Sequence, residues 1–228
     1  MPDLNPLEEL ESGVVTCRRC PRLVAWREEV ALKRKKAFRD QAYWGKPVPG
    51  FGDPAAQLLV VGLAPGAHGS NRTGRMFTGD ASGDFLYAAL HRAGFANQPT
   101  TLHREDGLTL HDCFITAVCR CVPPDNKPTP AEVITCRPFL AAEMEILQPR
   151  GVVALGRIAF DGLLALWADQ GIALPRLAFA HAAFYRLPGG LPWLLASYHP
   201  SKQNTQTGRL TPEMFDHIWR QARELLAA

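Results

Sequence analysis

The sequence predicts an α/β fold in which a central parallel sheet lies between two layers of helices. Four short apolar runs indicate strands, and helical patterns lie between them. The runs span residues 57–61 (QLLVV), 113–118 (CFITAV), 151–155 (GVVAL) and 193–197 (WLLAS). Because such runs are apolar on both faces, they favour a sheet that helices cover on both sides.

Helix signals fall between these strands. Residues 84–93 have helical periodicity and are followed by Gly94 as a stop. Thr129, Pro130 and Glu132 form the start of a second helix, with Thr129 as the N-cap of a capping box. Further helices are expected at 158–170 and 211–226, and residues 1–50 as an N-terminal helical arm packed on a single domain of residues 1–228.

The composition is that of a folded protein with only modest bulk charge. Apolar residues make up 46% and charged residues 21% of the chain, and the formal net charge is +3. A nucleic-acid interface would therefore need local basic patches. No apolar run approaches the roughly 18–20 residues of a membrane span. Residues 1–12 lack the pattern of a secretory signal, so we expect a cytoplasmic protein.

Clustered cysteines in that reducing compartment point to a metal centre. Cys17 and Cys20 form a Cys-x-x-Cys pair, Cys121 follows a strand, and Cys136 lies on the next expected helix. A Pro-Pro turn after Cys121 would fold that helix back toward it. Four thiolates suit either an iron–sulfur cluster or structural zinc, and the spacing does not separate the two. Cys113 and Cys119 fit a strand interior and are expected in the core.

Three unusual loops follow strands and should share one rim of the sheet. They span residues 62–80, 120–127 and 198–209. In an open α/β sheet, ligands bind beyond the carboxyl ends of the strands. Phe77 is a single aromatic residue in a polar, glycine-rich loop, and it suits either a stacking platform for a base or a core anchor. His199 suits either a hydrogen-bond donor to a ligand or a capping residue.

Polar residues after His199 favour contacts with DNA phosphates. Ser201, Lys202, Gln203 and Asn204 are of the types that make most such contacts. Residues 33–36 (KRKK) offer a second basic patch, although such runs usually lie on a solvated helix face.

Taken together, these motifs resemble the uracil-DNA glycosylase superfamily. Residues 62–66 (GLAPG) and 74–79 (GRMFTG) resemble its first motif, and residues 198–201 (YHPS) its histidine motif. Residues 121–127 (CVPPDNK), followed by Cys136, resemble the cluster segment of the iron–sulfur branches. The segments 69–80 and 203–209 look like family five, the type-B branch.

The resemblance implies a four-stranded parallel sheet and a structural [4Fe–4S] cluster held by four cysteines. These ligands would be Cys17, Cys20, Cys121 and Cys136. The chain departs from most branches at Leu63 and Ala64, where relatives carry a residue that positions water, and Ala117 replaces a uracil-reading asparagine. Family five shows the same gaps. The resemblance then assigns the water to Asn126, with Asp80 assisting.

The implied reaction is hydrolysis of the N-glycosidic bond of uracil in DNA, as in base excision repair, by a monomer that leaves an abasic site. The base would flip out of the helix and stack on Phe77, with the backbone N–H groups of Gly62, Leu63 and Ala64 near its edge. His199 would stabilise charge on a ring oxygen. Gly66, a small residue, implies that modified uracils and deaminated purines are also accepted.

Two other functions fit parts of the sequence. The lack of an acid in the first motif is consistent with a non-catalytic iron–sulfur module that binds nucleic acid. A zinc-stabilised α/β hydrolase acting on nucleotides fits the four cysteines equally well. Release of uracil from a duplex separates the first alternative from a glycosylase, and absorbance near 400 nm separates an iron–sulfur cluster from zinc.

Overall fold

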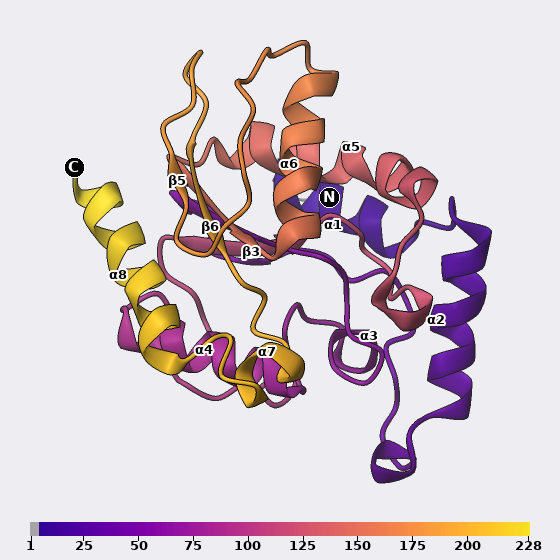
Figure 1. Cartoon of the computed structure of the whole chain (residues 1–228). Coiled ribbons are helices and arrows are strands. Elements are labelled where there is room, and N and C mark those ends of the chain that lie inside the picture. The colour runs from indigo at the N-terminus through magenta and orange to yellow at the C-terminus, as the bar shows by residue number, and fades with distance from the viewer. Residues whose placement is uncertain (1–4) are drawn as a thin grey trace.

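A six-stranded mixed sheet forms the centre of the computed structural model, which describes residues 5–228 (Figure 1). The order is β1-β3-β2-β4-β6-β5. Strands β2, β3, β4 and β6 pair in parallel. The strand bounds are β1 Phe51–Gly52, β2 Leu58–Gly62, β3 Cys113–Ala117, β4 Gly151–Leu155, β5 Phe184–Tyr185 and β6 Trp193–Ser197. The four apolar runs therefore form strands within a residue of the expected bounds.

The expected number of four strands is too low for this sheet. The edge strands β1 and β5 have two residues each and pair antiparallel with β3 and β6. Their residues are half-buried, so neither segment has the continuous apolar run that marks the central strands. Such short pairings depend on neighbouring strands being in place, which local sequence does not reveal.

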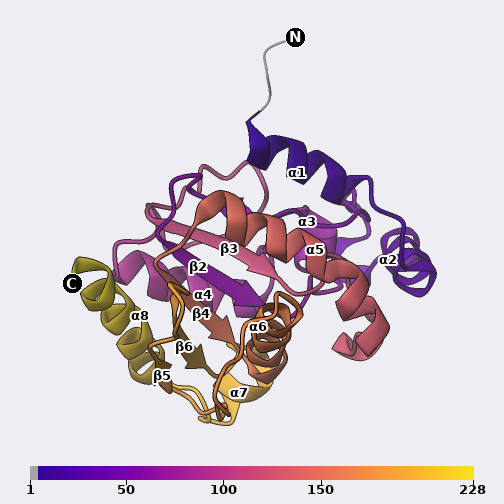
Figure 2. The same ribbon diagram turned by 90° about the horizontal axis from the view of Figure 1, so that it is seen from above.

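Helices cover both faces of the sheet (Figure 2). One face packs against α4 (Ala81–Arg92) and α8 (Pro212–Ala227), and the other against α5 (Pro130–Leu147) and α6 (Arg157–Asp169). Strand β2 shows why both layers are needed, because Leu58 and Val60 enter one core cluster while Leu59 and Val61 enter the other. All four are fully buried.

Capping residues fix the helix starts that matter for the site. Thr129 forms the expected capping box with Glu132 at the start of α5. Helix α4 begins three residues earlier than its periodicity indicates, because Asp80 is its N-cap and accepts from the backbone N–H groups of Ser82 and Gly83. The first turn of α4 is polar and contains a glycine, so apolar periodicity does not reveal where this helix begins.

The N-terminal arm contains two helices, α1 (Pro6–Val15) and α2 (Pro21–Lys33), followed by the short 3-10 helix η1 (Lys36–Phe38). Helix α1 packs on α5. Residues 1–4, the start of the expected arm, lie outside the described residues. The strand-end loops contain three short helical turns: α3 (Ser70–Thr73), η2 (Pro124–Asn126) and α7 (Lys202–Gln206). Among the described residues, no helix has the length and apolarity to cross a bilayer.

Candidate active site and cysteine cavity

The rings of Phe77 and His199 face each other where the loops after β2 and β6 meet. Their centroids are 5.7 Å apart, with a tilt of 30° between the ring planes. Gly62, the last residue of β2, lies against the same ring, and a Cβ atom at this position would be 2.9 Å from Phe77. The loops therefore converge on one place, as the sequence predicts. Glycine is required at the end of β2 because the aromatic ring occupies the space of a side chain.

Buried polar contacts hold the segment that carries Phe77. Phe77 has a positive φ of 51°, which is rare for an aromatic residue. On one side, Arg75 forms a buried, bidentate ion pair with Asp106 and donates to the Thr78 hydroxyl at 2.9 Å. On the other, the Tyr87 hydroxyl donates to the Met76 carbonyl at 2.8 Å. These contacts fix the backbone and therefore the position of the ring, which is 8% exposed.

The imidazole of His199 is neutral at pH 7. Burial lowers its pKa to about 4, because desolvation disfavours the charged form. A neutral imidazole can still donate one N–H hydrogen bond. The loop around it is held by the Asn204 amide, which donates to the His199 carbonyl at 2.8 Å. Gly156 packs closely against the His199 side chain, because a Cβ atom at position 156 would lie 3.2 Å from the His199 Cβ.

The two carboxylate oxygens of Asp80 face different parts of the structure, one the start of α4 and the other the first-motif loop. Oδ1 accepts from the Ser82 and Gly83 N–H groups at 3.0 and 3.1 Å. Oδ2 faces the first-motif loop, where Cβ atoms at Gly66 and Gly69 would lie 2.8 and 1.9 Å from it. Burial raises the pKa of Asp80, although the two backbone hydrogen bonds oppose this effect. One oxygen is thus committed to capping, and the other is directed at the loop.

The remaining first-motif residues and Asn126 occupy the same edge of the sheet. Leu63 and Ala64 are half-buried, and the Leu63 carbonyl accepts from the Cys119 N–H at 3.0 Å, which joins the loops after β2 and β3. Asn126 is exposed in η2 with a φ of 56°. Within residues 5–228 its side chain makes no hydrogen bond, so its assignment to the attacking water stays a prediction.

The expected DNA-contact residues divide into inward and outward groups. Ser201 caps α7 by accepting from the Asn204 N–H, and Asn204 directs its amide inward to the His199 carbonyl. Lys202 and Gln203 are exposed on the first turn of α7. In the sequence the four residues form one polar stretch, whereas in the structure Lys202 and Gln203 are exposed and Ser201 and Asn204 are half-buried.

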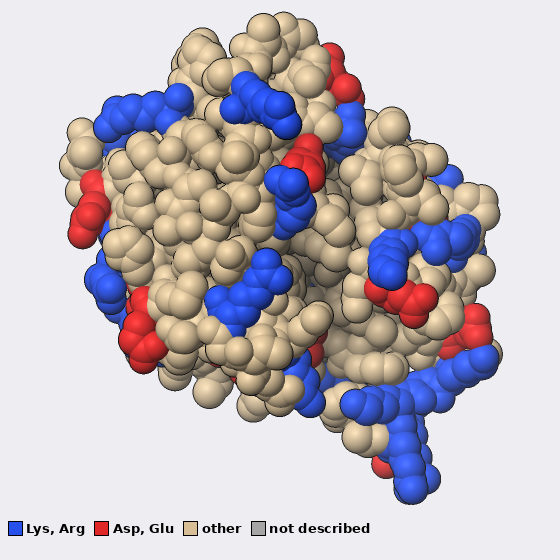
Figure 3. Space-filling model, in the orientation of Figure 1, with Lys and Arg blue, Asp and Glu red and all other residues tan. Residues whose placement is uncertain are grey.

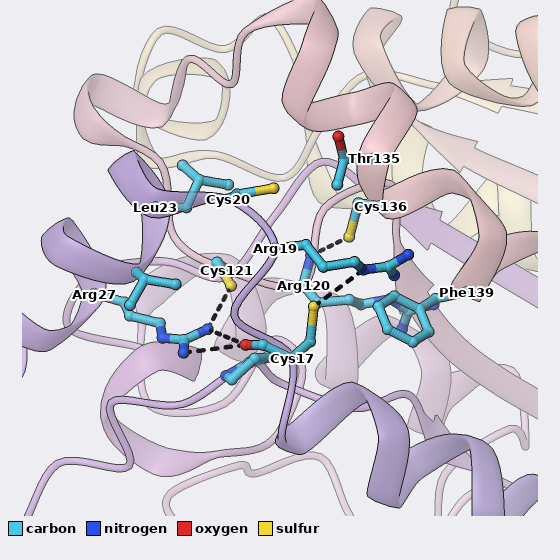
Figure 4. Close-up of a pocket in the computed structure, with 12 residues that line it drawn as sticks. Cys17, Arg19, Cys20, Leu23, Arg27, Arg120, Cys121, Thr135, Cys136 and Phe139 are labelled. Atoms are coloured by element: carbon cyan, nitrogen blue, oxygen red, sulfur yellow. Dashed lines mark hydrogen bonds between the residues drawn. The ribbon is translucent and has the colours of Figure 1, made fainter.

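A second site lies where α2, α5 and the loop after β3 meet (Figure 4). Its cavity contains about 320 Å³ of empty space, partly open to solvent, and the four expected ligand cysteines line it. Cys17 and Cys20 come from the α1–α2 connection, Cys121 from the loop after β3 and Cys136 from α5. Cys113 and Cys119 are buried outside this lining. Across residues 5–228, no three His, Cys, Asp or Glu side chains are close enough to hold a metal ion.

Nitrogen donors surround the sulfur atoms of this cavity. The Arg27 guanidinium donates to Cys121 Sγ at 2.9 Å, and the Arg120 backbone N–H donates to Cys136 Sγ at 3.2 Å. Hydrogen bonding to Cys119 lowers the pKa of Cys136 to about 7, whereas burial raises the pKa of Cys121 to about 11. A cavity lined by four thiols, with guanidinium and backbone N–H donors at three of them, has the chemistry of a site for an anionic metal–sulfur group.

Comparison with known proteins identifies the family. The model of the "Uracil DNA glycosylase superfamily" matches residues 49–223. A type-5 uracil-DNA glycosylase from Thermus thermophilus is 56% identical over 96% of this chain and 97% of its own length. One from Mycobacterium tuberculosis is 53% identical over 95% of this chain and 81% of its own. The chain belongs to the uracil DNA glycosylase superfamily. Within it, the chain belongs to family five.

The chain is more similar in sequence to type-5 than to type-4 uracil-DNA glycosylases from the same organism. A type-4 uracil-DNA glycosylase from Pyrobaculum aerophilum is 33% identical over 87% of this chain and 83% of its own length, while a type-5 protein from the same organism is 43% identical. The expected resemblance of the chain to this superfamily, and to family five within it, is therefore confirmed.

Two supporting residues of this glycosylase fold escape sequence reasoning. Arg27 lies in the middle of α2, between the buried residues Val24 and Val30, and it is 2% exposed and contacts a cysteine. His181 lies in an irregular loop, stacks on Tyr198 and accepts from its backbone N–H at 3.2 Å. A charged side chain among the apolar positions of α2 is the one available signal, and His181 has none.

Proposed function

We propose that this chain hydrolyses the N-glycosidic bond of uracil in DNA and leaves an abasic site. The observation that carries the proposal is the contact between Phe77 and His199 at the carboxyl edge of the sheet, in a chain that belongs to family five. A flipped base stacks on the Phe77 ring while the neutral His199 donates to a carbonyl oxygen of that base. Hydrogen bonding to the leaving base lowers the barrier as negative charge develops on it.

Water attack is the smaller part of the mechanism. Asp80 Oδ2 faces the first-motif loop and Asn126 lies on the neighbouring loop, and we assign the positioning of water to these two side chains. An amide is a feeble base, and one oxygen of Asp80 is engaged by the start of α4. Stabilisation of the leaving base and alignment of the reactants therefore dominate over proton abstraction.

Gly66 supports a substrate range wider than uracil. It is half-buried beside the Asp80 carboxylate, and it presents no side chain that could press on the 5-position of a pyrimidine. Exclusion of a single methyl group by an apolar contact is worth only about 1–3 kcal/mol in any case. Modified uracils and deaminated purines are therefore proposed as further substrates.

The cysteine cavity is proposed to hold a [4Fe–4S] cluster with a structural role. The donor set fits, because four cysteines line one cavity and Arg19, Arg27 and Arg120 donate to three of the four sulfur atoms. When bound, such a cluster joins three chain segments and supplies no electron to the hydrolysis. Iron content and absorbance near 400 nm of the purified protein test this proposal, and zinc in their place contradicts it.

The decisive experiment for activity is base release from duplexes that carry one lesion each. Uracil opposite guanine should be excised fastest, because a mispaired base flips at the lowest cost. Hypoxanthine and 5-hydroxymethyluracil duplexes test the wider range. Binding without abasic sites at any enzyme concentration supports the alternative of a non-catalytic nucleic-acid module.

A further inference from the structure

A projecting basic arm follows α2 and has no role in the site described above. We define it as residues 33–39, with the cations Lys33, Arg34, Lys35, Lys36 and Arg39, all exposed. These cations gather at the lower right of Figure 3, where Figure 1 draws the segment after α2. In the described part of the chain, only Lys33 among them forms an ion pair, with Glu29. The arm therefore presents concentrated positive charge to solvent.

The basic arm is docked onto the loop that leads to Phe77. The guanidinium of Arg72 lies over the Phe38 ring, 4.0 Å from its centroid. Arg72 also donates to the Gln41 side chain at 2.6 Å and to the Gly79 carbonyl at 2.7 Å. Arg72 is 9% exposed, and its guanidinium links the arm to the segment between Phe77 and Asp80.

A second contact reinforces this attachment. The Tyr43 hydroxyl and His68 Nδ1 are 3.0 Å apart, and the same hydroxyl accepts from the Lys35 backbone N–H at 3.3 Å. Within the arm, the Arg34 guanidinium donates to the Arg39 carbonyl at 2.8 Å. These contacts fix the backbone of the arm. The Lys35 amino group lies 6.0 Å from the centroid of the Phe38 ring, and among the described residues neither Lys35 nor Lys36 forms an ion pair.

We propose that the basic arm binds the phosphate backbone of DNA beside the flipped nucleotide. The inference rests on the proposed function and adds a contact surface to it. The arm lies on the side of the molecule that carries α3 and α7, the short helices of the two loops that meet at Phe77 and His199 (Figure 1). Because Arg72 joins the arm to the base-stacking loop, phosphates held by Lys35 and Lys36 are kept in register with the pocket.

The salt dependence of DNA binding tests this surface. Each phosphate contact contributes about 0.9 to the slope of log K against log salt, which is about five-fold in affinity at 0.15 M salt. The variant Lys35→Gln/Lys36→Gln should lower the slope by between about one and two and raise Kd about five- to thirty-fold on a uracil-free duplex. The matched control is Arg176→Gln/Arg220→Gln, which removes the same charge from the loop before β5 and from α8.

Only a loss specific to the arm supports the proposal. A slope and Kd that change in the arm variant no more than in the control overturn it, since bulk charge then explains the effect. Equal thermal melting of the two variants shows that both are folded. Uracil release by the wild-type chain is measured separately, so a protein that binds through the arm but releases no base contradicts the proposed function and leaves the surface supported.

Discussion

At the scale of single residues, the neutral state of His199 links chemistry to stability. Its pKa is about 4 in the folded chain and about 6.5 when unfolded. Between these values the unfolded chain binds more protons, so the free energy of unfolding falls as the pH drops from 6.5 to 4 and is unaffected by this group above 6.5. The imidazole therefore stays neutral, and able to donate, throughout the physiological range.

We expect His199→Gln to remove most of this acid sensitivity while slowing base release strongly. The wild-type chain should lose up to about 3 kcal/mol between pH 6.5 and 4 through this residue, which is the depressed pKa expressed as free energy. Urea unfolding of both proteins at pH 7 and pH 5 measures the difference. Identical pH slopes would show that His199 is not buried as a neutral group.

Asp80 combines a helix cap with a proposed place in the chemistry, and two substitutions separate the roles. Asparagine keeps a capping oxygen, so Asp80→Asn should retain stability within a few tenths of a kcal/mol. Asp80→Ala should lower the free energy of unfolding by about 1 kcal/mol. Single-turnover release of uracil by the stable Asp80→Asn variant then reports on the carboxylate alone. An unchanged rate would remove Asp80 from the water-positioning assignment.

At the scale of elements, α7 shows that neighbouring polar residues have different tasks. Ser201 and Asn204 hold the turn after β6, whereas Lys202 and Gln203 are exposed. The His199 carbonyl accepts a hydrogen bond from the Asn204 side-chain amide, which is directed back toward the turn. Asn204 thus supports the backbone that carries the imidazole.

Asn204→Ala should therefore reduce the rate of base release at saturating DNA, because the His199 backbone loses its donor. Lys202→Gln should instead weaken binding and lower the salt slope by about 0.9, as expected for one phosphate contact. Single-turnover rates together with salt-dependent affinities of both variants measure the split. The reverse pattern would assign Asn204 to DNA and Lys202 to the fold.

At the scale of the whole molecule, the cysteine cavity joins segments that are far apart in sequence. The α1–α2 connection, the loop after β3 and α5 meet there, and the loop after β3 is hydrogen-bonded to the first-motif loop through Cys119 and Leu63. A cluster in this cavity would stabilise the fold and the loop that carries Asn126. Its ligands are then also folding elements.

Loss of the proposed cluster should lower thermal stability. We expect Cys121→Ser to lose iron, absorbance near 400 nm and several degrees of melting temperature, because a ligand and its contact with Arg27 are removed together. Cys113→Ala, a buried cysteine on β3 outside the cavity lining, is the control and should retain its iron. Retention of full iron content by Cys121→Ser would mean that the cluster has other ligands.

Local signals in the sequence determined the central strands, the capped helices and the motifs that place this chain in family five. Apolar runs such as 151–155 and the capping box at Thr129 act over a few residues, so they can be recognised without the fold. The tertiary structure decided which of those residues meet. The contacts that build the site depend on segments that are distant in sequence. They are the facing rings of Phe77 and His199, the ion pair of Arg75 with Asp106, the hydrogen bond of Asn204 to the turn after β6, and the stacking of Arg72 on Phe38. Such contacts arise only when the chain is packed, because side-chain direction at a loop position has no periodicity to reveal it.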